Sequence, residues 1–226
     1  MSFPMRRHLL VVVIGFALIA SARANSVVFS TFGPGDSFDM TASWAVHGAV
    51  GSPSGLPLLI AAQFTVQASG NLVSVDLGMR FSQSFGPGLF NVYLYNDSGG
   101  VPDASTAVFL GSDGSFGTFT ALVSLPVSGT VSVSAGSSYW LSLQPALENA
   151  WCFWDFSSPL LLGTIDYSRD GATWFLVGTS QEMPAFRLTA TSTVPDSSCT
   201  IILLATSSLV LVGLRRYDND AIFSPR

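Results

Sequence analysis

The chain has 226 residues, of which 48% are hydrophobic and only 10% are charged, and its formal net charge is −5. It contains no lysine, and between positions 25 and 193 only three arginines stand against eleven acidic residues. Because nucleic-acid binding requires clustered basic side chains, this balance excludes a nucleic-acid partner and is typical of a domain that stays soluble outside the cell.

The first 24 residues have the three parts of a secretory signal peptide. A pair of arginines at 6–7 is followed by the apolar run 9–20. Ala22 and Ala24 then supply the small residues that signal peptidase requires, so we expect cleavage to leave Asn25 as the new N-terminus. The apolar run is short for a membrane span, and an uncleaved anchor helix is the alternative.

Residues 25–193 are predicted to form one all-β extracellular domain. In the clearest strand, 73–81, one face carries Val73, Val75, Leu77, Met79 and Phe81. Further strands are predicted at 91–95, 119–125, 130–133, 138–143, 150–156, 165–167, 174–177 and 186–190. Clusters of Gly, Pro, Ser and Asp separate them. The pattern predicts a jelly-roll-like antiparallel β-sandwich, flanked by an N-terminal signal helix and a C-terminal transmembrane helix.

The sequence of this domain contains no recognisable catalytic constellation. His47 is its only histidine and lies in a Gly/Ser-rich segment, so we interpret it as an exposed loop residue. No serine has a GxSxG elbow, and one histidine with one cysteine cannot form a usual zinc site. We therefore assign no catalytic residue and expect no enzyme. Cys152 is interpreted as a small buried hydrophobe, and a disulfide to Cys199 is the alternative.

Acidic residues near turns could serve two kinds of chemistry. The pairs that a hydrolase could use are Asp36 with Asp39, Asp97 with Asp103, and Asp166 with Asp170. Each pair lies beside Gly, Pro or Ser, so we interpret all of them as turn residues that bind backbone amides. Calcium takes carboxylate and carbonyl oxygens, which makes Asn96, Asp97 and Asp103 weak calcium candidates; no other cofactor is expected.

Tryptophans suggest a glycan contact, because sugars stack their C–H faces on exposed aromatic rings. The possible contacts are Trp151, Trp154 and Trp174. Trp151 and Trp154 are three positions apart and face opposite sides of a regular strand, so at most one of them lies in the core. Core packing for most of these rings is the alternative interpretation.

The C-terminal segment has a polar motif, an apolar run and a basic stop. These are Val194-Pro195-Asp196-Ser197-Ser198, the run 199–214, and Arg215-Arg216. A helix over the run would span about 24 Å, short of the hydrocarbon core of about 30 Å. The basic pair should stay cytoplasmic with the tail 217–226, which puts the preceding domain outside the membrane.

This tripartite segment, 194–216, resembles the sorting signals of the PEP-CTERM class, and most closely its VPDSG-CTERM variant. Ser198 stands where that variant has Gly, and ten residues follow the arginine pair where family members usually end. The resemblance implies that an exosortase-type membrane protease cuts near Pro195-Asp196 and transfers or releases the protein. An ordinary single-pass membrane anchor is the alternative.

The middle of the chain also resembles the choice-of-anchor R type of domain. The segments that carry this resemblance are 33–39 (GPGDSFD), 61–66 (AAQFTV), 91–103 (NVYLYNDSGGVPD), 137–143 (SSYWLSL) and 170–174 (DGATW). The resemblance implies a sandwich displayed at the cell surface, and it brings no established catalytic residues.

Taken together, these features predict a non-enzymatic exported protein of the cell surface or extracellular matrix. The resemblance implies association with exopolysaccharide and biofilm, with the membrane and an exosortase-type protease as partners and extracellular polysaccharide as a further candidate. Before sorting, the protein would be anchored at the outer face of the membrane. The alternative function is a carbohydrate-binding module or adhesin anchored at the cell surface, and a hydrolase ranks last.

Overall fold

The computed structural model describes residues 24–50, 52–82, 84–114 and 118–192, and residues Ala24–Ser192 form one compact unit. Its strands are β1 (Asn25–Ser30), β2 (Phe38–His47), β3 (Leu59–Thr65), β4 (Gly70–Phe81), β5 (Phe90–Asn96), β6 (Val108–Asp113), β7 (Phe119–Pro126), β8 (Ser132–Val133), β9 (Ser138–Pro145), β10 (Trp151–Ser157), β11 (Leu162–Ser168), β12 (Trp174–Glu182) and β13 (Phe186–Ser192). Two short 3-10 helices, η1 (Pro34–Asp36) and η2 (Ala104–Thr106), lie between strands.

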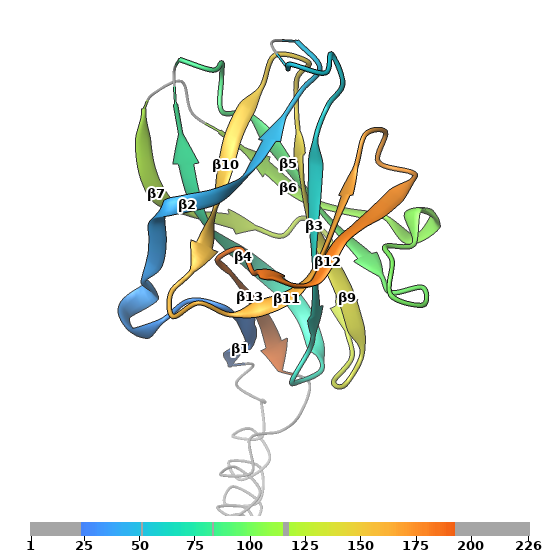
Figure 1. Cartoon of the computed structure of the whole chain (residues 1–226). Coiled ribbons are helices and arrows are strands. Elements are labelled where there is room, and N and C mark those ends of the chain that lie inside the picture. The colour runs from blue at the N-terminus through green and yellow to red at the C-terminus, as the bar shows by residue number, and fades with distance from the viewer. Residues whose placement is uncertain (1–23, 51, 83, 115–117, 193–226) are drawn as a thin grey trace, which may run out of the picture. The chain divides into compact units, whose positions relative to one another are not determined.

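The strands form two antiparallel sheets, which confirms the predicted β-sandwich (Figure 1). The seven-stranded sheet has the order β1-β13-β4-β10-β2, and β7 and β8 also pair with β4. The six-stranded sheet has the order β12-β11-β3-β9-β5-β6. The predicted signal helix, sorting motif and transmembrane helix lie outside the described residues. None of the helices within those residues has the length and hydropathy that crossing a bilayer requires.

Strand β4 organises the seven-stranded sheet, because four other strands pair with it. β13 and β10 share one of its edges, while β8 and β7 share the other. The predicted alternation is confirmed from Val75 to Phe81, whose odd-numbered residues are buried. The register shifts between Thr189 and Ala190 of β13, so Leu72 takes the buried position that we expected for Val73. Val73 is the extra residue of a β-bulge, which the alternation of apolar and polar residues in the sequence does not reveal.

The main core lies between the sheets and is almost entirely apolar. Its large buried side chains are Leu77, Met79, Trp154 and Phe186 from one sheet and Ile60, Phe64, Leu141 and Leu143 from the other. Burying each such side chain contributes about 1.5–3 kcal/mol to the hydrophobic driving force. Cys152 is 1% exposed within this core, where burial raises the pKa of its thiol, so its interpretation as a buried hydrophobe is confirmed.

The predicted strands all correspond to observed ones, although their bounds differ by several residues in places. The segment 130–133 is strand only at Ser132–Val133. Four strands, β1, β2, β3 and β6, had no counterpart in the prediction. Three of these lie at an edge of their sheet, where both faces contact fewer residues and the alternation of apolar and polar side chains is weaker.

Candidate functional site

Both ends of the compact unit lie at the same end of the sandwich (Figure 1). Asn25 pairs with Thr191, and Ser192 pairs with Gly70, where β4 begins. β4 then runs to Phe81 at the opposite end, which we call the distal end.

Three loops meet at the distal end: 48–58 after β2, 82–89 after β4 and 146–150 after β9. The amide of Val50 donates to the carbonyl of Glu148 over 2.7 Å, and that of Trp151 donates to the carbonyl of Pro87 over 2.9 Å. Gly48 lies so close to this third loop that a Cβ would come within 2.2 Å of the Glu148 carbonyl oxygen. The loops are thus held together by their backbones, which leaves their side chains available.

Large apolar side chains project into solvent from these loops. Val50 is 55% exposed, Leu56 50%, Phe85 53% and Leu147 47%. We call these four residues the apolar tip. Single exposed apolar residues need no explanation, but four on adjoining loops of one end indicate an interaction surface.

A stack of rings lies beneath Phe85. The Trp151 ring lies 4.3 Å from the His47 ring and 5.2 Å from the Phe85 ring, both in stacked geometry. His47 is 6% exposed at the end of β2, so its interpretation as an exposed loop residue is wrong. The Gly/Ser-rich stretch begins only after it. The stack supports Phe85 from below and gives the apolar tip a rigid base.

An ion pair continues this surface along the outer face of the seven-stranded sheet. The Arg80 guanidinium lies 5.2 Å from the centre of the Phe153 ring and 3.6 Å from Asp155. Asp155 is fully buried, and burial raises its pKa to about 7, an effect that the Arg80 charge opposes. A carboxyl group without solvent access cannot reach a substrate, so Asp155 is a structural residue rather than a catalytic base.

The structure separates the three tryptophans proposed as glycan contacts. Trp154 is fully buried in the core and donates to the carbonyl of Ala185 over 3.0 Å, so its assignment as a glycan contact is wrong. Trp151 faces outward from the same strand, as the three-residue spacing predicted. Trp174 lies on the other sheet, with its ring 5.5 Å from that of Tyr95. Only Trp151 belongs to the distal end.

The three residues proposed for calcium contact different partners. Asp103 accepts hydrogen bonds from the amide and the hydroxyl of Ser105 as the N-cap of η2. The Asn96 amide donates to the Thr106 hydroxyl, and Asp97 points toward the six-stranded sheet. Within the described residues no group of three or more His, Cys, Asp or Glu side chains could hold a metal ion. Asn96, Asp97 and Asp103 therefore do not converge as one ligand set.

The turn interpretation of the other two acidic pairs holds for Asp39 and Asp170 only. Asp39 accepts from Thr41, and Asp170 accepts from the amides of Ala172 and Thr173, which lower its pKa to about 2. Asp36 instead forms an ion pair of 2.5 Å with Arg187. Asp166 contradicts the interpretation, because it lies within β11 and is fully buried.

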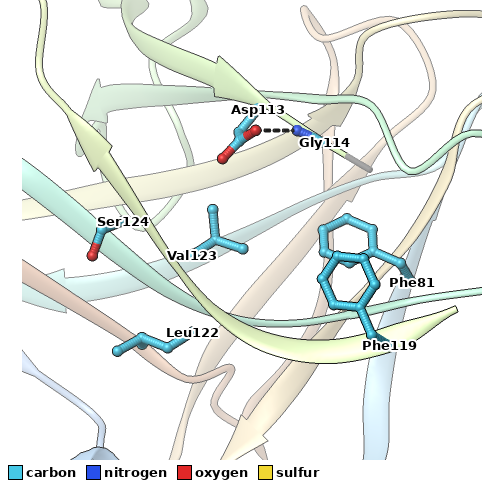
Figure 2. A pocket seen from close by; sticks show the side chains of 7 residues that line it. All are labelled: Phe81, Asp113, Gly114, Phe119, Leu122, Val123 and Ser124. Carbon is cyan, nitrogen blue, oxygen red and sulfur yellow. Dashed lines mark hydrogen bonds between the residues drawn. The ribbon is translucent and has the colours of Figure 1, made fainter. Parts of the chain in front are cut away.

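A shallow hollow of about 220 Å³ lies beside β7 (Figure 2). The Phe81 and Phe119 rings lie together on one side of it, with their centres 5.1 Å apart. Its polar groups are engaged locally: Asp113 accepts from the Gly114 amide over 2.6 Å, and the Ser124 hydroxyl donates to Asp76. Without convergent polar groups, this hollow offers no chemistry for a substrate.

The fold and the distal end define a β-sandwich with an apolar surface borne on loops. No family model and no curated protein matches the sequence. One similar solved structure is that of the cysteine protease and lectin-like domains of Cwp84, a surface-layer-associated protein of Clostridium difficile. It is 15% identical, with a TM-score of 0.44, and the match covers 60% of this chain and 32% of that one. This chain thus matches about a third of that structure's length, and no functional argument follows from a likeness at this level.

Sequence reasoning did not find the apolar tip or its support. Val50, Leu56 and Leu147 are single apolar residues inside Gly-, Pro- and Ser-containing loops, and no periodicity identifies them. The only available signal was Phe85, a large apolar residue within the turn-rich stretch 82–89.

Proposed function

We propose that this chain is an exported, non-enzymatic surface protein that presents a β-sandwich with its apolar tip directed away from the cell. The observation that carries the proposal is the placement of both ends of the unit opposite the tip. A tether at the C-terminus then leaves the apolar tip as the part of the domain that first meets its surroundings.

The bounds of the compact unit support export and sorting. β1 begins at Asn25, the residue expected after signal cleavage, and β13 ends at Ser192, two residues before Val194 of the sorting motif. Processing at either site would leave every described strand intact. We propose that an exosortase-type protease cuts near Pro195-Asp196 and that the domain reaches the cell surface or matrix.

Mass spectrometry of the mature chain recovered from cells tests this processing. We expect an N-terminus at Asn25 and a C-terminus near Asp196. A mature protein that retains Arg226 would replace sorting with a plain membrane anchor. Asp196→Ala should cause the unprocessed form to accumulate, and Asp218→Ala, beyond the basic pair, is the matched control.

For the ligand of the apolar tip, we propose an extracellular polysaccharide. The exposed Phe85 ring is backed by a stacked indole, which offers a rigid apolar face to the C–H surface of a sugar. The described arginines are engaged in ion pairs or carbonyl contacts, so an acidic polymer would find no free cation on this unit. A neutral polysaccharide fits this surface better.

Retention of the full-length protein on immobilised neutral polysaccharide tests the tip. Phe85→Ala should reduce retention at least tenfold, because it removes the exposed ring. Phe175→Ala on β12 is the matched control, since that ring is similarly exposed at 48% but belongs to the other sheet. Equal retention of both variants would contradict a role for the tip, and retention on protein-coated but not on polysaccharide surfaces would indicate an adhesin for proteins.

A further inference from the structure

The outer face of the six-stranded sheet carries a second, smaller cluster that the proposed function does not use. Three of its side chains come from neighbouring strands: Ala61 of β3, Tyr95 of β5 and Trp140 of β9. Trp174 of β12 packs against them from the sheet edge. Trp140 is fully buried and Tyr95 is 2% exposed, although they lie on the side away from the main core. These rings form a roof over this part of the sheet.

Buried polar atoms without hydrogen-bond partners gather under this roof. Asp166 lies directly opposite Ala61 in the register of β11 and β3, and Ala61 lies directly opposite Ser142 of β9. Both Asp166 carboxylate oxygens, the Ser142 hydroxyl and the Trp174 indole nitrogen are buried and unpartnered. Because Ala61 is small, the two polar side chains flank a position with little side-chain volume. Such groups require a partner, since each unpaired one costs folding free energy.

A second carboxylate contacts side chains of the same sheet. Asp97, which follows β5, uses one carboxylate oxygen to accept from the Trp140 indole over 2.7 Å and from the Gln63 amide over 2.8 Å. Its other oxygen has only a long contact, 3.3 Å, from the Gly100 amide. Burial raises the pKa of Asp166 to about 6, and the Asp97 charge adds to that rise. Gln63, with its nitrogen engaged by Asp97, keeps a carbonyl oxygen for another partner.

No basic group of the described chain neutralises this pair. Arg80 contacts Asp155, Arg187 contacts Asp36 and Asp76, and Arg169 donates to the Pro57 carbonyl. His47 is stacked on Trp151 at the distal end of the other sheet. Buried charges are normally paired or bind a metal, and within the described residues no basic group pairs with these two carboxylates.

We propose that Asp97 and Asp166 bind a divalent cation of the calcium type beneath the aromatic roof. Carboxylate, hydroxyl and amide oxygens are the ligands that Ca²⁺ takes, and the Ser142 hydroxyl and the Gln63 carbonyl are the neutral oxygens nearest in the register. Waters would complete a shell of six to eight oxygens. The absence of nitrogen and sulfur ligands from the cluster disfavours zinc. This inference is independent of the proposed function of the tip.

Calorimetry and thermal unfolding of the full-length chain, stripped with EDTA, test the site. Ca²⁺ should bind with one-to-one stoichiometry and raise the midpoint of unfolding by about 5 to 10 °C at a hundredfold excess over its dissociation constant. Asp166→Asn, which keeps the side-chain size, should abolish both the heat and the shift. Glu148→Gln, on an exposed loop, removes one charge elsewhere and should leave both unchanged.

Terbium luminescence provides a readout that does not depend on the folding of an Asp166 variant. Tb³⁺ occupies calcium sites, and an adjacent indole should sensitise its emission in the wild-type chain. Replacing both Trp140 and Trp174 by Phe should reduce that emission severalfold, because both indoles belong to the roof, whereas Trp44→Phe, on the other sheet, should not. The proposal is overturned if the wild type shows neither heat nor a thermal shift with millimolar Ca²⁺, if Asp166→Asn still binds Ca²⁺, or if Mg²⁺ alone binds.

Discussion

The two outer faces of the sandwich differ in whether a basic side chain lies near their buried carboxylates. On the seven-stranded sheet, Asp76 lies 2.7 Å from Arg187 and Asp155 lies 3.6 Å from Arg80. On the six-stranded sheet, Asp166 has no basic partner within the described residues and is covered by aromatic rings. Two of the three arginines of the domain thus lie on the seven-stranded sheet, next to buried carboxylates. Both Asp155 and Asp166 are buried without hydrogen-bond partners, so the difference between the two faces is the guanidinium group that lies near Asp155.

Removing a basic partner on the outer face of the seven-stranded sheet should have the largest effect on stability. Arg187→Met leaves Asp76, with only 7% of its side chain exposed, without its ion pair. Because breaking a buried pair leaves an uncompensated charge, we expect a loss of about 3 kcal/mol in the free energy of unfolding, measured by urea denaturation.

The matched control for this change is Arg169→Met. Arg169 donates to the Pro57 carbonyl and has no carboxylate partner among the described ion pairs, so we expect a loss below about 1 kcal/mol. If Arg169→Met destabilised the domain as much as Arg187→Met, the contrast between paired and unpaired acids would not explain the stability of this sheet.

An intermediate effect is expected at the aromatic roof of the other face. Trp140 donates to the Asp97 carboxylate, whereas the indole nitrogen of Trp174 has no partner. Because hydrogen bonds to charged groups are worth about 1.5–3 kcal/mol, Trp140→Phe should cost about 2 kcal/mol more than Trp174→Phe in urea denaturation. Equal losses would mean that the two rings act through packing alone.

A further effect is the dependence of stability on pH at Asp155. Burial raises its pKa to about 7 in the folded state, above the value of about 4 of an aspartate in an unfolded chain. The folded state then binds more protons between these values, so the stabilising contribution present at pH 4 is lost as the pH rises to 7. Asp155→Asn should flatten the stability profile in this window, measured by urea denaturation from pH 4 to 7.5. A profile of unchanged slope would contradict this origin of the pH dependence.

The sequence predicts the interior of this fold better than its edges. β4 and β9 turn alternate apolar side chains into the core, so their pattern is visible without a structure. β2 is an edge strand whose residues are mostly half-exposed on both faces, and its pattern does not distinguish a strand from a loop. His47 was therefore assigned to a loop although it belongs to that strand.

The candidate sites were only partly predictable, for a different physical reason. Successive side chains of a strand point to opposite faces, which places Trp151 outward and Trp154 inward. The same alternation places Asp166 on the face opposite to the core residue Ile165. This alternation does not show which side chains cover the outward face at Asp166. The rings above Asp166 come from β5, β9 and β12, and only the strand order brings these strands together.

The placement of both ends at one end of the sandwich has a mechanical consequence. A tether after Ser192 and a ligand held at the apolar tip would pull on the domain along the direction of its strands. β13 pairs with β1 on one side and β4 on the other, and its hydrogen bonds lie across that direction. Tension would then load these bonds in shear, so that they must break together rather than one after another. The strand arrangement therefore suits a domain that must resist unfolding under a pulling force.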